Sequence, residues 1–84
     1  MKNQGNSMQP QNPNAQAQQS LDHAHNSVAM AQSHPDAQMI EQAENSLQNA
    51  ERSVNQMEGE SKPGAVQLAK SELREEQENF ESLQ

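Results

Sequence analysis

The sequence has no cysteine, tryptophan or tyrosine, and Phe80 is its only aromatic residue. Without cysteine there are no disulfides, thiolate nucleophiles or cysteine-ligated zinc sites. This composition is typical of a reducing compartment, so we expect a cytoplasmic protein. Aromatic side chains dominate most ligand pockets and interface hot spots. We therefore expect neither an enzyme nor a cofactor-binding protein.

Basic residues and long apolar runs are also scarce. Five Lys and Arg stand against twelve Asp and Glu, which gives a formal net charge of -7. Nucleic-acid affinity comes mostly from Lys and Arg that neutralise phosphates, so no nucleic-acid partner is expected. No apolar run approaches the roughly 20 residues that span a bilayer. No apolar segment follows Lys2 as in a signal peptide, so we expect neither a membrane protein nor conventional secretion.

The N-terminal segment is rich in amides. Residues 1–19 contain ten Gln or Asn, interrupted by Pro10 and Pro13. This composition predicts a disordered tail, followed by a helical domain over residues 20–84. Prion-like self-association is the alternative for such a tract. Proline and the lack of aromatics oppose β-stacking, which favours a solvated arm.

Apolar spacing of three and four residues predicts three helices, at about 21–33, 35–58 and 62–83. Ser20 is a suitable N-cap for the first helix, because its hydroxyl can accept a hydrogen bond from a free backbone N–H. Gly59 is the expected stop of the second helix.

The two breaks between the helices have similar chemistry. Pro35 disfavours helical geometry at the preceding residue but is tolerated in a first helical turn. Ser33 with Asp36 three residues later resembles a capping box. Ser61 with Pro63 repeats the pattern, so we expect a second helix start there.

A seven-residue block recurs within the predicted helices. Residues 21–27 are LDHAHNS, residues 40–46 are IEQAENS, and residues 47–53 are LQNAERS. Each begins with a large aliphatic residue and carries Ala three positions later. Alanine on an apolar stripe lets helix axes approach toward the lower end of the usual ~8–10 Å range.

These heptads predict an all-α protein with a coiled-coil-like seam. Short breaks between helices make antiparallel neighbours, so we expect an antiparallel helical hairpin extended to a three-helix bundle. The alternative is a two-helix hairpin that dimerises into four helices. The predicted helix–helix interface comprises Leu21, Val28, Ile40, Ala43, Leu47, Ala50, Val54, Met57, Val66, Ala69, Leu73 and Phe80.

The seam is thin, which bears on function. Each heptad buries one large side chain, at roughly 1.5–3 kcal/mol, whereas ordering seven residues costs ~10 kcal/mol. A weak monomer implies self-association or a helical protein partner. The prediction is thus a non-catalytic structural or protein-interaction module that acts through the Ile40–Met57 seam. A storage or solvating protein of spores or stressed cells is the alternative.

Polar clusters offer few candidates for chemistry. His23 and His25 are two residues apart and point in different directions on a helix, so a metal site is not expected. Ser27 recurs at the heptad position of two other serines, where packing or surface polarity explains it. Glu76 interrupts the apolar stripe of the third helix within an acidic run, which we interpret as a solvated face. That run comprises Glu72, Glu75, Glu76, Glu78 and Glu81.

Two blocks, SLDHAHNSVAMAQS and IEQAENSLQNAERSVNQ, resemble small helical proteins of Bacillus-type spore-forming bacteria. The start, MKNQGNSMQPQNPN, is similar in style to small acid-soluble spore proteins. The glycine-rich and basic elements of the DNA-binding members of that class are missing here. The resemblance therefore implies a storage or matrix role in the spore and not DNA coating.

Overall fold

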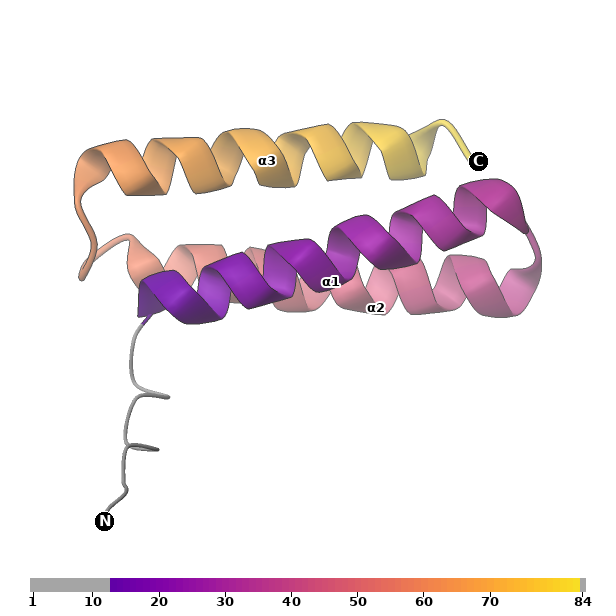
Figure 1. The fold of residues 1–84 in the computed structure, drawn as a ribbon, viewed down its shortest axis with the longest axis horizontal. Coiled ribbons are helices and arrows are strands. Elements are labelled where there is room, and N and C mark those ends of the chain that lie inside the picture. The colour runs from indigo at the N-terminus through magenta and orange to yellow at the C-terminus, as the bar shows by residue number, and fades with distance from the viewer. Residues whose placement is uncertain (1–12, 84) are drawn as a thin grey trace, which may run out of the picture.

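Three helices form an up-down-up bundle in the computed structural model, which describes residues 13–83. They are α1 (Pro13–Ser33), α2 (Ala37–Met57) and α3 (Pro63–Glu81). Helix α2 runs back along α1, and α3 then runs in the same direction as α1 (Figure 1). The predicted all-α fold is confirmed, in the form of the three-helix bundle.

Helix α1 begins earlier than the sequence pattern predicted. It starts at Pro13, so residues 13–19 are helical and the predicted disorder is wrong for them. Residues 1–12, the rest of the predicted tail, lie outside the described residues. Proline suits a first helical turn, and Ala17, four residues before Leu21, extends the buried stripe by one step. Ser20 is therefore an interior residue of the helix and not its N-cap.

The caps of the other helices also differ from the prediction. Asp36 itself is the N-cap of α2, and its Oδ1 accepts a hydrogen bond from the Met39 N–H at 2.9 Å. Ser33 is the last residue of α1, so the expected capping box does not form. Lys62 precedes Pro63 at the start of α3 without a side-chain cap, and Ser61 does not fill that position.

The core is tightest between α1 and α2. Contacts between these helices are far more extensive than those that either makes with α3. The alanines at heptad spacing on both helices are fully buried, which is the close packing that small side chains permit. The alanines concerned are Ala17, Ala24, Ala31, Ala43 and Ala50.

The attachment of α3 uses larger side chains that keep a little exposure. Val66, Leu73 and Phe80 retain 8–9% of their surface, whereas Ala69 is fully buried. The bundle is thus a close α1–α2 hairpin with α3 packed less extensively beside it. None of these three helices is long and apolar enough to cross a membrane.

Candidate functional site

The residues predicted for the helix–helix interface mostly lie in the core of this bundle. Ile40 is partly buried and packs against the core from its edge. The others are buried: Leu21, Val28, Ala43, Leu47, Ala50, Val54, Met57, Val66, Ala69, Leu73 and Phe80. The α2 seam therefore contacts the chain's own helices and is not open to a partner along its length.

Two serine pairs bridge α1 and α2. The hydroxyls of Ser20 and Ser53 lie 2.9 Å apart, and those of Ser27 and Ser46 also lie 2.9 Å apart. Ser20 and Ser27 are one heptad apart on α1, and Ser46 and Ser53 are one heptad apart on α2. The two serine pairs therefore occupy the same heptad position and lie one heptad apart along the helices. Sequence spacing placed three of these serines beside the seam, but it did not show that they pair across it.

Glu76 is the polar residue within the apolar stripe of α3. The predicted solvated face is wrong for this member of the acidic run, because only 8% of Glu76 is exposed. Its Oε2 accepts a hydrogen bond from Nδ1 of His25 on α1, at 2.7 Å. The imidazole side chain itself is 65% exposed. Burial of a carboxylate is expensive without such a partner.

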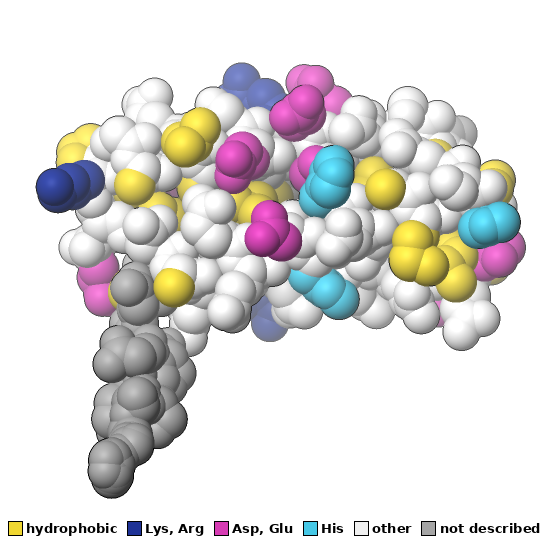
Figure 2. Space-filling view, in the orientation of Figure 1, with side chains coloured by type: hydrophobic (Ala, Val, Ile, Leu, Met, Phe, Trp, Pro, Cys, Tyr) yellow, Lys and Arg dark blue, Asp and Glu magenta, His cyan; other side chains and the backbone are white. Residues whose placement is uncertain are grey.

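The charge around this pair is negative. The hydrogen bond to Glu76 and then the charge of Glu76 raise the pKa of His25 above 6.5. Burial acts in the opposite direction, and the weaker charges of Asp22 and Glu75 raise the pKa again. These residues line a small hollow between α1 and α3 together with Glu72 and Asn79. Figure 2 shows Asp and Glu side chains gathered near the middle of this view of the molecule.

A second ion pair joins the C-cap of α2 to a residue of α3. Lys70 Nζ is 2.6 Å from Oε2 of Glu58, the C-cap residue of α2. Both side chains are about half exposed, at 53% and 44%. Exposed pairs of this kind contribute ~0–1 kcal/mol, so this one adds little to the attachment of α3.

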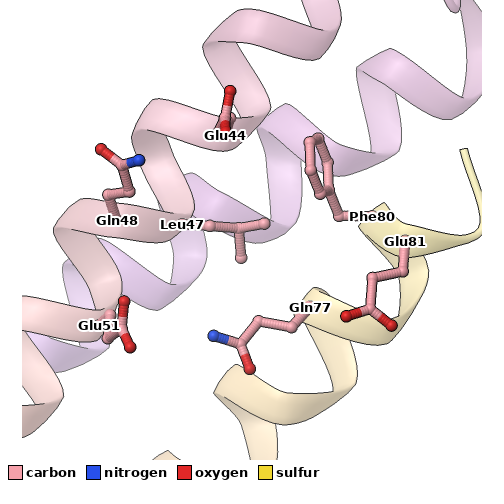
Figure 3. A pocket seen from close by; sticks show the side chains of 7 residues that line it. All are labelled: Glu44, Leu47, Gln48, Glu51, Gln77, Phe80 and Glu81. Carbon is pink, nitrogen blue, oxygen red and sulfur yellow. The ribbon is translucent and has the colours of Figure 1, made fainter. Parts of the chain in front are cut away.

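A shallow groove of about 300 Å³ separates α2 from α3. Leu47 of α2 and Phe80 of α3 point into it from opposite sides (Figure 3). They are 7% and 9% exposed, so they form an apolar floor that solvent still reaches. The rim is polar and mostly acidic, and it comprises Glu44, Gln48, Glu51, Gln77 and Glu81.

Metal ligation has no assembled set among residues 13–83. No group of three or more His, Asp or Glu in this range is arranged to hold a metal ion. His25 is engaged with Glu76, and His23 lies on an exposed part of α1.

The chain matches no family model, and no curated protein or solved structure is significantly similar to it. The groove and the His25–Glu76 contact are therefore the features on which a function can be based. The sequence signal for the His25–Glu76 contact was the charged residue Glu76 within the apolar stripe of α3. Its partner His25 could not be identified from the pattern, because it lies 51 residues away in the chain.

Proposed function

We propose that the chain is a non-catalytic interaction module that binds a helix of another protein in the groove between α2 and α3. The observation that carries this proposal is the apolar floor of Leu47 and Phe80 beneath an acidic rim. Amphipathic helices dock in grooves by inserting apolar anchors at helical spacing. The lack of cysteine favours a reducing compartment, so we place its action in the cytoplasm. The resemblance to spore proteins makes the spore the alternative.

In the structure, the groove limits the part of the Ile40–Met57 seam that a partner can contact. Helices α1 and α3 cover most of the Ile40–Met57 stripe, so a partner does not replace them along its length. Leu47 belongs to that stripe and also reaches the groove. The partner helix thus contacts the seam at Leu47 in this groove, and the bundle stays closed.

Charge selects the kind of helix that fits. The rim carries Glu44, Glu51 and Glu81, all exposed. A second copy of this chain brings a formal net charge of -7, and repulsion opposes its docking there. We therefore favour a partner helix with one large apolar side chain flanked by Lys or Arg at three- or four-residue spacing over self-association.

The experiment compares two charge reversals on the same helix. Glu51→Lys changes the rim, whereas the matched control Glu41→Lys changes an exposed residue of α2 outside the groove lining. Tagged wild-type protein and both variants are used to capture partners from host lysate, and a captured protein is purified and titrated against each. We expect Glu51→Lys to weaken binding at least tenfold and Glu41→Lys to leave it within about twofold.

Equal binding by the two variants contradicts the groove as the docking site. A wild-type chain that captures nothing and sediments as a monomer at every concentration contradicts the interaction module. The storage alternative predicts little fixed tertiary structure, and the fully buried alanines between α1 and α2 weigh against it. High abundance in spores with no bound partner is the result that would favour storage.

A further inference from the structure

Glu76 occupies a position where an apolar residue would pack. The buried stripe of α3 runs Val66, Ala69, Leu73, Glu76 and Phe80, at steps of three and four. A carboxylate there loses most of its water when α3 packs on the hairpin, and the contact with His25 is the compensation that the structure shows. His25 is thus the side-chain partner that the structure gives to this buried carboxylate.

The geometry of the bundle makes α3 the element that can separate. Its contacts with α1 and α2 are much less extensive than those between α1 and α2. The hairpin also has two serine pairs between α1 and α2, and neither of them involves α3. A turn over residues 58–62 joins α3 to α2, so α3 can leave while the hairpin stays paired.

We propose that the contact between His25 and Glu76 is a pH-responsive latch that holds α3 on the α1–α2 hairpin and weakens as pH rises. With a protonated imidazole, the contact is a charge-assisted hydrogen bond between opposite charges. With a neutral imidazole, Nδ1–H still donates but the attraction is lost. The buried carboxylate of Glu76 is then poorly compensated.

The groups that face His25 reinforce this direction. Asp22 lies on its own helix, and Glu72, Glu75 and Glu76 come from α3; no charged residue of α2 lines this hollow. All four are acidic, so each favours the protonated imidazole while α3 is docked. Release of α3 removes three of these carboxylates from His25 and leaves Asp22.

The sign of the pH dependence follows from linkage. The docked chain holds the His25 proton more tightly, because its pKa is raised above 6.5. The stabilisation of docked α3 is therefore complete below pH 6.5 and is lost as pH rises through the raised pKa. The docking equilibrium constant changes about tenfold for each unit by which the pKa of His25 differs between docked and released α3.

The latch acts on the isolated chain and does not require a partner. It would also control the groove of the proposed function, because Phe80 leaves Leu47 when α3 separates. Tests on the purified chain therefore keep the two proposals distinguishable: a failed latch leaves groove binding to a partner untouched, and a failed partner search leaves the latch untouched.

The first test titrates His25 by NMR in the wild type and in Glu76→Gln. We expect the pKa of His25 to fall in the variant, toward the ordinary 6.5. The reason is that the substitution removes the carboxylate that accepts the hydrogen bond and attracts the protonated imidazole. Should Glu76→Gln fail to fold, Glu76→Leu completes the apolar stripe and serves instead. An unchanged pKa of His25 in the folded variant overturns the latch.

The second test follows α3 with pairs of spin labels, which the cysteine-free chain allows. Labels at Gln18→Cys and Ser71→Cys report the α1–α3 distance, and labels at Gln18→Cys and Gln56→Cys report the α1–α2 distance. All three sites are exposed. In urea series from pH 5.5 to 8.5, we expect the α1–α3 pair to separate at lower urea than the α1–α2 pair.

The gap between the two urea midpoints should widen as pH rises. His25→Gln should abolish this widening, whereas His23→Gln, an exposed neighbour on the same helix, should retain it. The fold-change in docking must match the difference in His25 pKa from NMR at about tenfold per unit. Simultaneous separation of both label pairs at every pH, or equal pH dependence in the two histidine variants, overturns the latch.

Discussion

Close packing between α1 and α2 predicts that Ala24 tolerates no larger side chain. Ala24 is 0% exposed, and it lies on α1 between Ser20 and Ser27. The hydroxyls of these two serines are each 2.9 Å from a serine of α2, which sets the separation of the helices on both sides of Ala24. Ala24→Leu adds three carbons at this point, so the helices must move apart or the side chain must adopt a strained rotamer.

Overpacking of this kind costs about 1–3 kcal/mol in well-packed cores. A domain of this length has roughly 4–11 kcal/mol of stability at the usual value per residue. The substitution should therefore remove a substantial fraction of the free energy of unfolding. The melting temperature should fall by about 4–24 °C, since each kcal/mol shifts it by about 4–8 °C in a small domain.

Ala29→Leu is the matched control for this substitution. Ala29 is on the same helix but exposed, so the chemical change is identical and only burial differs. Leucine and alanine have similar helix propensity, and exposed substitutions usually stay within about 0.5 kcal/mol. Urea denaturation followed by circular dichroism measures both variants. An Ala24→Leu protein that is as stable as the control, or more stable than the wild type, would refute the close α1–α2 interface.

Substitutions at two further polar contacts are measured by the same urea assay. Ser27→Ala leaves the buried Ser46 hydroxyl without its partner and should lower the free energy of unfolding by about 1–3 kcal/mol. The double variant Ser27→Ala with Ser46→Ala should lose less than the sum of the two single losses, because the two residues interact. Losses that add strictly contradict the hydrogen bond. Asp36→Ala removes the acceptor for the Met39 N–H and should cost about 0.5–2 kcal/mol, whereas Asp36→Asn should retain most stability. Equal losses in the two Asp36 variants contradict its role as the N-cap.

Some of the fold could be predicted because it depends on local spacing. Steps of three and four residues marked the helices, and Pro35 and Pro63 marked their breaks. The start of α1 was missed for a compositional reason. Ala17 is a single apolar residue within an amide-rich segment, so the sequence pattern does not mark it as part of a helix. The structure shows that Ala17 is buried and extends the apolar stripe of α1.

The candidate site depended on contacts between distant residues. Sequence alone identified Glu76 as a break in the stripe of the third helix, and it identified His25 as a polar residue of the first helix. It could not join them, because their pairing requires the turn of the bundle that brings α3 beside α1. The groove has the same origin, since Leu47 and Phe80 come together only when α3 packs against α2.

By itself, the sequence determined the number of helices, most of the stripe that each buries and the acidic, cysteine-free composition. These follow from periodicity and composition, which are properties of neighbouring residues. The tertiary structure alone decided that the α2 seam is covered by the chain's own helices, that the serines pair, and that Glu76 is buried against His25. The physical reason is that the cost of burying a side chain depends on which distant residue lies against it.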